Sequence, residues 1–320
     1  MTIKHVISVS GGKDSLATLL IAMTRFPRSS IVPIFCDTGN EHEAVYEYLD
    51  YLEVRLGITI TRLKANFDAE IASKRMFIAR DVRTRRKNGR RVRWTNKAKR
   101  RALAHLHPTG NPFLDLCMWK GRFPSRKAQF CTEQLKRDPA IEFQLELINQ
   151  DHTVVSWQGV RRDESANRRD AKMFERIGPR MFIYRPIVEW TAAMVFAWCA
   201  LHVVKPNPLY LQDMSRVGCM PCINVNKAEL AQIARRFIAH LGRIFNWEQL
   251  VGLCSKRGAA TFIPAPSKGK KIIDQFEYAV ANNIWSVVEW AKTTRGGKQF
   301  DLLLDITDGA ACSSSYGLCE

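Results

Sequence analysis

Long apolar segments are missing from this 320-residue chain. The longest nearly apolar run covers 191–204, contains His202 and is shorter than the roughly 18 residues that a membrane-spanning helix requires. A secretory leader is also missing, because Met1 and Thr2 lead directly into an apolar strand pattern, and the nine cysteines are odd in number. We therefore expect a soluble, cytoplasmic protein with reduced thiols and no membrane partner.

Acidic residues are scarce relative to basic ones. The chain has 49 Lys and Arg against 31 Asp and Glu, which gives a net charge of +18. The stretch from Arg80 to Arg101 alone holds twelve cations and one acid, Asp81. So dense a run of like charge favours a polyanionic partner, and we expect an inserted arm that binds nucleic acid (DNA or RNA), with Trp94 stacking on a base. A solvated loop without a ligand is the alternative.

Strand and helix patterns alternate along much of the chain. The apolar runs that predict strands lie at 3–9, 31–36, 58–63 and 153–157. The helical spacings lie at 16–23, 41–56 and 191–202. This alternation predicts an α/β fold, a doubly wound parallel sheet of Rossmann-like type, with the ligand at the carboxyl ends of the strands.

Composition also suggests domain boundaries. We expect a first domain at 1–205, interrupted by the basic insertion at about 68–110. A cysteine-containing C-terminal region at 206–320 follows, with a basic linker at 264–271 and an apolar helix at 272–290.

A glycine-containing segment separates the first strand from the first helix. It consists of Ser10, Gly11, Gly12, Lys13, Asp14 and Ser15. Glycines let backbone N–H groups close around a phosphate, and the N-terminus of the helix adds a favourable dipole. A Walker-type loop would need glycine in place of Ile7 and Ser or Thr in place of Asp14, so that class is disfavoured. The segment resembles instead the pyrophosphate loop of the adenine nucleotide alpha-hydrolase superfamily, which implies a site for ATP or an adenosine phosphosulfate.

Further segments narrow the resemblance to one family. The stretch 157–165, Trp-Gln-Gly-Val-Arg-Arg-Asp-Glu-Ser, is followed by Arg185-Pro186-Ile187 and Asn207-Pro208-Leu209-Tyr210. In this order the segments resemble those of phosphoadenosine phosphosulfate (PAPS) reductases, over residues 4 to 225. Beyond the glycine segment, the nucleotide-binding residues that the resemblance implies are Asp37, Thr38, Gly39, Gly159, Arg161 and Arg168. The expected catalytic residues are Lys13, Asp14, Arg161 and Arg162, and Asp14 or Asp37 is the expected Mg²⁺ ligand.

The cysteines indicate a metal centre. Cys219 and Cys222 share a Cys-Met-Pro-Cys segment, and Cys131 stands where iron–sulfur members of the PAPS reductase family have two adjacent cysteines. The resemblance implies a 4Fe–4S cluster, with Cys254 favoured as the fourth ligand. The other candidates for that fourth position are Cys117, Cys312 and Cys319. Zinc bound by four sulfurs and a redox dithiol are the alternatives to the cluster. Cys36 and Cys199 lie in apolar runs, where we expect core side chains.

Three functions follow from these patterns. The leading hypothesis is an enzyme that adenylates its substrate with ATP and transfers sulfur to nucleic acid, as in phosphorothioation of DNA or thiolation of tRNA. It would need a sulfur donor such as a cysteine desulfurase, and a homodimer is a further expectation. The second hypothesis is a reductase of adenosine phosphosulfates, although the family's Glu-Cys-Gly-(Leu or Ile)-His tail is not in this sequence. The third is a nucleic-acid-binding regulator without turnover.

Overall fold

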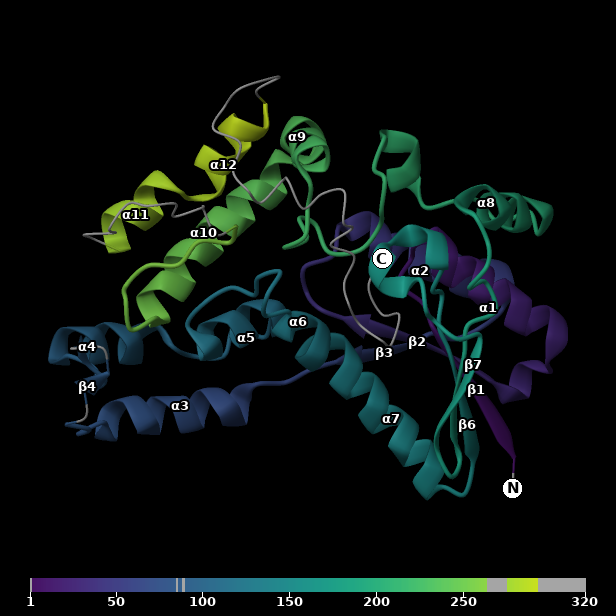
Figure 1. The fold of residues 1–320 in the computed structure, drawn as a ribbon, viewed down its shortest axis with the longest axis horizontal. Helices are drawn as coiled ribbons and strands as arrows, with labels where there is room; N and C mark the ends of the chain where they lie inside the picture. The colour runs from purple at the N-terminus through teal and green to yellow at the C-terminus, as the bar shows by residue number, and fades with distance from the viewer. Residues whose placement is uncertain (1, 85, 88–89, 264–274, 293–320) are drawn as a thin grey trace. The chain divides into compact units, whose positions relative to one another are not determined.

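The computed structural model describes residues 2–84, 86–87, 90–263 and 275–292, which fall into two compact units (Figure 1). The first unit is formed by 2–65 and 129–224, and the second by the described residues of 66–128 and 225–292. This division differs from the predicted one, because the insertion is longer than 68–110 and 206–224 belongs to the first unit. No helix in the described ranges is long and apolar enough to cross a membrane.

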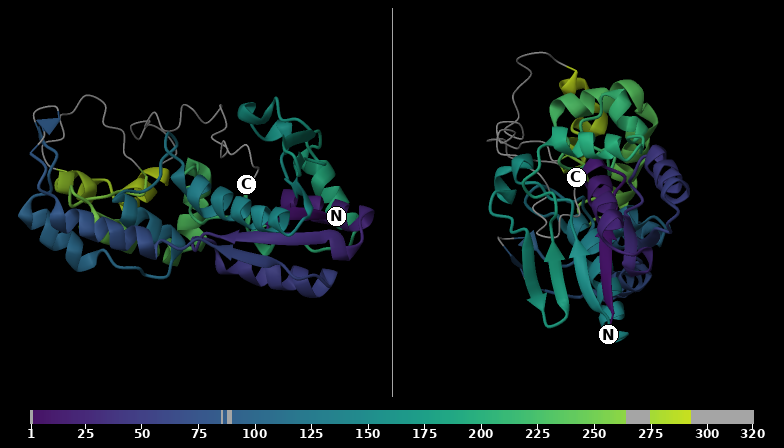
Figure 2. Two further views of the ribbon diagram at one scale, coloured as in Figure 1. Left: turned by 90° about the horizontal axis from the view of Figure 1, so that it is seen from below. Right: turned by 90° about the vertical axis from the view of Figure 1, so that its right-hand side faces the viewer.

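The first unit contains a six-stranded sheet. Its strand order is β3-β2-β1-β6-β8-β7, and every neighbouring pair is parallel except β7 with β8. The strands lie side by side in the right-hand view of Figure 2. Their bounds are β1 Ile3–Ser8, β2 Ile31–Asp37, β3 Thr61–Lys64, β6 Thr153–Trp157, β7 Phe174–Gly178 and β8 Met181–Tyr184. The predicted α/β class and the doubly wound parallel sheet are therefore confirmed.

Helices connect these strands. The α-helices of the unit are α1 Lys13–Arg25, α2 Glu43–Leu56, α6 Phe130–Thr132, α7 Asp138–Asn149 and α8 Ala192–Leu201. A π-helical turn at Glu133–Arg137 joins α6 to α7, and 3-10 turns lie at Arg28–Ser30, Arg162–Glu164, Ala166–Arg168 and Pro208–Gln212. The sequence-based bounds agree within about three residues, and Thr191 caps α8 by accepting a hydrogen bond from the Met194 amide.

The order of the strands creates the binding crevice. The chain moves outward from β1 to β2 and β3, and then returns to place β6 on the other side of β1. Because crossovers between parallel strands are right-handed, connections that move in opposite directions along the sheet lie on opposite faces of it. Helix α7 packs Phe143 and Leu147 against a core that includes Val6 and Val154. The connections after β1 and β6 leave this reversal in opposite directions along the sheet, and open α/β sheets bind ligands at such a point.

The second unit is helical rather than an extended arm. Its helices are α3 Asp68–Arg80, α4 Asn96–His105, α5 Pro112–Lys120, α9 Lys227–Arg236, α10 Ile238–Cys254, α11 Gln275–Ala281 and α12 Ile284–Ala291. Two short strands, β4 Arg86–Lys87 and β5 Arg90–Arg91, pair between α3 and α4. The predicted single helix at 272–290 is instead two helices in its described part, because the Asn283 side chain accepts hydrogen bonds from the Trp285 and Ser286 amides and starts α12 anew.

Candidate functional site

Two serines fix the loop between β1 and α1. Ser15 Oγ donates a hydrogen bond to the Gly12 carbonyl (2.9 Å) and accepts one from the Ser10 amide (3.1 Å). Ser10 Oγ accepts from the Gly12 amide at 3.3 Å. Gly11 has φ +80°, and a Cβ there would lie 3.2 Å from a methyl carbon of Val45, so glycine suits both its conformation and its space. The predicted segment therefore forms one defined turn at the start of α1.

The start of α1 carries positive potential. No side chain caps the helix at Gly12, and the Lys13 amide donates to the Tyr210 hydroxyl at 3.0 Å. Lys13 Nζ lies 5.7 Å from the centre of the Tyr210 ring and 3.3 Å from Asp14 Oδ2. A lysine beside a helix N-terminus is suited to hold phosphate oxygens.

Gly159 allows the loop after β6 to pack directly on this turn. A Cβ on Gly159 would lie 2.9 Å from both the carbonyl carbon and the oxygen of Asp14, and 3.0 Å from the Ser15 amide nitrogen. Those are backbone atoms, which cannot rotate away as a side chain can. The glycine is therefore required for the contact between the two loops at the switch point.

The three predicted arginines have different surroundings. Arg161 is buried and donates from Nε to Asp14 Oδ1 at 2.7 Å, with 5% and 1% of the two side chains exposed. Arg168 is also buried and pairs with Glu164. Arg162 is 40% exposed. Arg161 thus holds Asp14 in place, and Arg162 lies at the surface, so these residues do not form one convergent clamp.

Asp37, Thr38 and Gly39 lie at the carboxyl end of β2, next to β1 in the sheet. Asp37 Oδ1 accepts hydrogen bonds from the Gly39 amide (2.9 Å) and the Tyr46 hydroxyl (2.7 Å). Burial, followed by the charge of Glu41 and the bond to Asp37, raises the pKa of Tyr46. Thr38 Oγ1 donates to Glu41 Oε1 at 2.6 Å. This loop is therefore an ordered acidic segment.

The segment with Cys219 and Cys222 is held against that loop. The Met220 amide donates to the Asn40 carbonyl (2.8 Å), and Asn40 Nδ2 donates to the Pro221 carbonyl (3.0 Å). Cys219 Sγ lies 3.7 Å from Glu41 Oε1 and 3.5 Å from Thr38 Oγ1. Asn40 and Glu41 were not among the predicted site residues, although they directly follow the Asp-Thr-Gly motif.

Lys136 lies among the thiols and was also missed. Burial alone would lower the pKa of Lys136, but the neighbouring Cys219, Glu41 and Cys222 raise it on balance. Burial, followed by the charge of Cys222, raises the pKa of Cys131 to about 11. The structure thus brings Cys131, Cys219 and Cys222 into one electrostatic neighbourhood. Lys136 stands five residues after Cys131, and only the folded turn at 133–137 shows that it belongs to the site.

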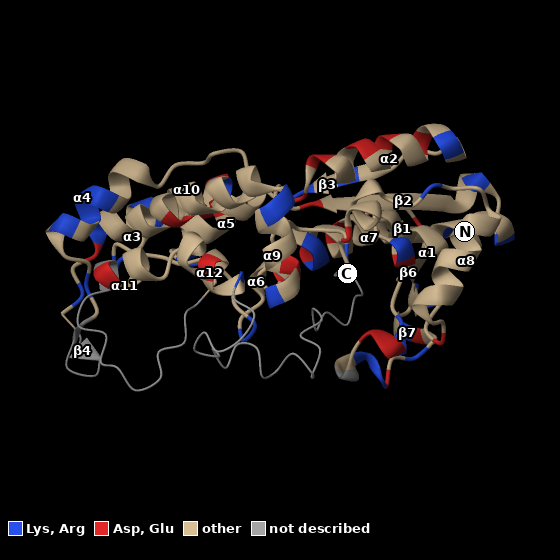
Figure 3. Ribbon diagram, turned by 90° about the horizontal axis from the view of Figure 1, so that it is seen from above, with Lys and Arg blue, Asp and Glu red and all other residues tan. Residues whose placement is uncertain are grey.

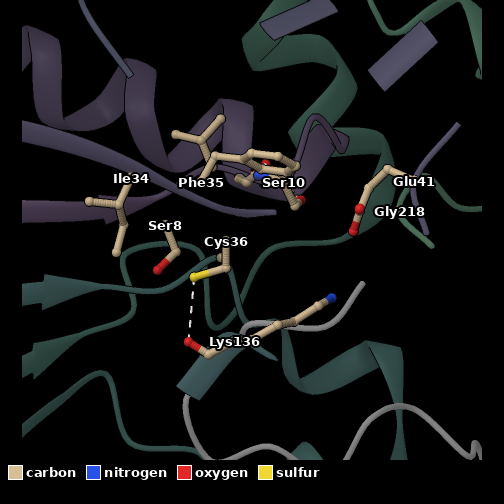
Figure 4. A pocket seen from close by; sticks show the side chains of 11 residues that line it. Ser8, Ser10, Ile34, Phe35, Cys36, Glu41, Lys136 and Gly218 are labelled. Atoms are coloured by element: carbon tan, nitrogen blue, oxygen red, sulfur yellow. Dashed lines mark hydrogen bonds between the residues drawn. The ribbon is translucent and has the colours of Figure 1, made fainter. Parts of the chain in front are cut away.

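One pocket joins the loop and the thiol-bearing region (Figure 4). It is lined by Ser10 and Ser15 of the glycine turn, by Gly159, and by Glu41, Lys136 and Gly218. Cys36, which we expected in the core, packs against the core and also lines this pocket, with its Sγ 3.4 Å from the Lys136 carbonyl oxygen. The glycine-containing turn and Gly218, which precedes Cys219, therefore line the same small cavity.

The remaining predicted cysteines lie elsewhere in the chain. Cys254 belongs to the second unit, where it ends α10 and is 1% exposed, and Cys117 is buried in α5 of the same unit. Cys199 is buried in α8, as expected. Cys312 and Cys319 lie outside the described residues. The fourth ligand of a cluster therefore stays a prediction.

The amino-acid sequence matches a known protein family. The family model described as phosphoadenosine phosphosulfate reductase domain matches residues 4–225. An uncharacterized 37.8 kDa protein of Escherichia phage 186 is 46% identical over 99% of this chain and 96% of its own length. An uncharacterized protein of Methanocaldococcus jannaschii is 27% identical over 72% of this chain and 38% of its own.

Reductases resemble shorter parts of the chain. The adenosine 5'-phosphosulfate reductase of Deinococcus radiodurans is 33% identical over 21% of this chain and 26% of its own length. The solved structure of PAPS reductase from Candida auris in a phosphate complex covers 68% of this chain and 82% of its own, at 15% identity and a TM-score of 0.42. With the family model matching most of the sequence, the chain belongs to the phosphoadenosine phosphosulfate reductase family.

Proposed function

We propose that this protein is an enzyme that binds ATP, or a related adenine nucleotide, at the turn from Ser10 to Ser15 and uses it for sulfur transfer to nucleic acid. The observation that carries the proposal is that Ser10, Ser15 and Gly159 line one pocket together with Glu41, Lys136 and Gly218. The thiol of Cys219 lies beside that pocket, with its Sγ 3.7 Å from Glu41 Oε1. Nucleotide activation and sulfur delivery can act on the same substrate atom only if their sites adjoin.

The first step is adenylation. A substrate oxygen attacks the α-phosphorus of ATP, the bond to the bridging oxygen breaks, and pyrophosphate leaves. Lys13 and the amides at the start of α1 offset the charge that develops on the leaving group. Of the two predicted Mg²⁺ ligands, Asp37 fits better than Asp14, because both oxygens of Asp14 already face cations, at 2.7 Å from Arg161 and 3.3 Å from Lys13.

The second step is sulfur transfer. A persulfide from a donor such as a cysteine desulfurase attacks the activated atom, and AMP leaves. A dithiol reductant then attacks the donor's sulfur in the resulting substrate–donor disulfide, which releases the thiolated substrate, and its second thiol releases the donor as a free thiol and leaves the reductant as a disulfide. The positive charge of Lys136 would offset the negative charge of thiolates at Cys219 and Cys222.

Three thiols would hold an iron–sulfur cluster here, namely Cys131, Cys219 and Cys222, together with a fourth ligand. A zinc ion bound by the same sulfurs is the alternative. A bound cluster would supply electrons or hold the transferred sulfur.

The second candidate is reduction of an adenosine phosphosulfate, favoured by the similarity of part of the chain to adenosine 5'-phosphosulfate reductases. One set of assays separates the functions. Pyrophosphate release from ATP that DNA or RNA stimulates supports sulfur transfer, and sulfite release from a phosphosulfate supports reduction. Nucleic-acid binding with neither product supports the regulator and overturns the proposed enzyme.

The assay has a matched pair of variants. Lys13→Gln removes the charge beside the turn and is expected to abolish pyrophosphate release. Lys4→Gln removes the same charge near the opposite end of β1, where Lys4 Nζ donates to the Ser29 carbonyl at 3.0 Å, and should leave release unchanged. Equal activity of the two variants would remove Lys13 from the mechanism.

A further inference from the structure

The second unit contains a cationic pocket that the proposed chemistry does not use. It is lined by α3, the segment after α5, the segment after α10 and α11. Six cations line it, namely Lys74, Arg83, Lys120, Arg122, Lys256 and Arg257. Its described lining contains no Asp or Glu. All of these residues belong to one compact unit, so the pocket is a feature of that unit alone.

The cations crowd one another. Burial lowers the pKa of Lys74, and the charges of Lys120 and Arg83 lower it further. Arg83 Nε also contacts the buried carboxylate of Asp81 at 2.7 Å. A bound anion would lower the repulsion that Lys120 and Arg83 exert on Lys74, because like charges in a concave, partly desolvated site raise its affinity for the opposite charge.

Aromatic side chains stand among these cations. Phe77 on α3 is 42% exposed, and Tyr278 on α11 is half-buried. The Arg83 guanidinium lies 4.8 Å from the centre of the Phe77 ring, and Lys74 Nζ lies 5.7 Å from it. The pocket thus has cations that can bind phosphate beside an aromatic ring that is accessible to a base. Trp94, by contrast, is 5% exposed, which corrects the expectation that its face is open for stacking.

We propose that this pocket binds a single-stranded segment of nucleic acid, with phosphates at Lys74 and Lys120 and an unpaired base against Phe77. The proposal rests on the proposed function and gives its nucleic-acid substrate a defined binding site. Cations alternating with aromatic rings are typical of single-strand sites, where base faces are open for stacking. A duplex presents its phosphates but keeps those faces within the base stack.

The pocket includes only part of the basic stretch from Arg80 to Arg101. Arg83 lines the pocket, whereas Lys97 and Arg100 lie exposed on α4, much of which is blue in Figure 3, and do not line it. Two positive charges can therefore be removed either from the pocket or from α4. Comparing the two variants distinguishes binding in the pocket from general attraction to a basic surface.

The test is fluorescence anisotropy of labelled single-stranded DNA and RNA oligonucleotides with the full-length protein over a salt series. The double variant Lys74→Gln/Lys120→Gln should lower the slope of log K against log salt by about 1.4, since each phosphate contact contributes about 0.7 for single strands. At 0.1 M salt this corresponds to about 25-fold weaker binding, relative to a common value at 1 M. The control Lys97→Gln/Arg100→Gln should change binding less than about threefold.

A further variant tests the stacking contact separately from the charges. Phe77→Leu should weaken binding at least about fivefold without altering the salt slope, because it removes stacking rather than a phosphate contact. Circular dichroism and thermal melting establish that each variant is folded. Equal losses in the two charge pairs would overturn the pocket, as would unchanged binding in Lys74→Gln/Lys120→Gln.

Competition experiments distinguish a single-strand site from a site for small anions or for duplex backbone. Tripolyphosphate or ATP that displaces the oligonucleotide at equal concentration would make this a small-anion site, and a duplex of equal affinity would make it a backbone site; both results overturn the proposal. Binding of ATP, measured by calorimetry without nucleic acid, tests the nucleotide site separately. If Lys13→Gln weakens ATP binding while oligonucleotide binding is lost only in the pocket variants, both proposals stand. If ATP binding is absent and oligonucleotide binding persists, only the proposed activity fails.

Discussion

The contact between Gly159 and the first turn of α1 gives the sharpest prediction. An alanine at 159 places its Cβ 2.9 Å from the Asp14 carbonyl group, whereas ordinary contacts begin at 3.4 Å. The loop must therefore retreat by about half an ångström, and overpacking of this kind costs about 1–3 kcal/mol. For a unit of this size, the melting temperature should fall by roughly 2–12 °C.

The same displacement should weaken nucleotide binding. Because Asp14 and the Ser15 amide belong to the turn, Gly159→Ala moves the groups that face the phosphates, and we expect at least about a tenfold loss of ATP affinity by calorimetry. Gly178→Ala is the matched control in the same unit, since its Cβ would lie 3.5 Å from the Met181 Cβ, an ordinary contact. If Gly159→Ala melts and binds ATP like Gly178→Ala, the two loops do not pack as described and the argument for the switch-point site is refuted.

Two further predictions concern buried charge. Arg161→Met leaves Asp14 without its 2.7 Å partner and should lower the free energy of unfolding by about 3 kcal/mol or more in urea titrations, whereas Arg162→Met, at a site 40% exposed, should change it by less than about 1 kcal/mol. Similar values for the two variants would contradict the buried ion pair. Burial raises the pKa of Glu248 to about 7 despite bonds from two backbone amides. Folding then takes up a proton between the usual carboxyl pKa and pH 7, so the free energy of unfolding should fall as pH rises through that window. The fall should be smaller in Glu248→Gln, and parallel pH profiles would refute the shift.

The elements of the sheet in the first unit could be predicted from local patterns. The apolar run at 153–157 predicts a strand with the bounds of β6, because a short apolar run between polar turns has few other interpretations. The second unit could not be placed this way. Dense Lys and Arg obscured the helical spacing of α4, whose few apolar contacts are made by small side chains such as Ala98 and Ala102.

Only part of the candidate site could be predicted from the sequence. Gly12 and Lys13 could be predicted as site residues, because they belong to one continuous motif whose residues are neighbours in the sequence. The partners of the thiols could not, because Glu41 and Lys136 reach Cys219 from segments far apart in the chain. Arg161 illustrates the opposite limit, since sequence suggests a phosphate-binding cation but burial against Asp14 makes it a positioning residue.

The discontinuous second unit has a consequence for protein synthesis. Helices α3, α4 and α5 leave the ribosome long before α10, yet α10 packs on both α4 and α5 and completes their core. A nascent chain must therefore finish the sheet of the first unit while the earlier helices still wait for their partner. For the same reason, a recombinant fragment that stops at residue 225, where the family match ends, would expose apolar helix faces and be prone to aggregate.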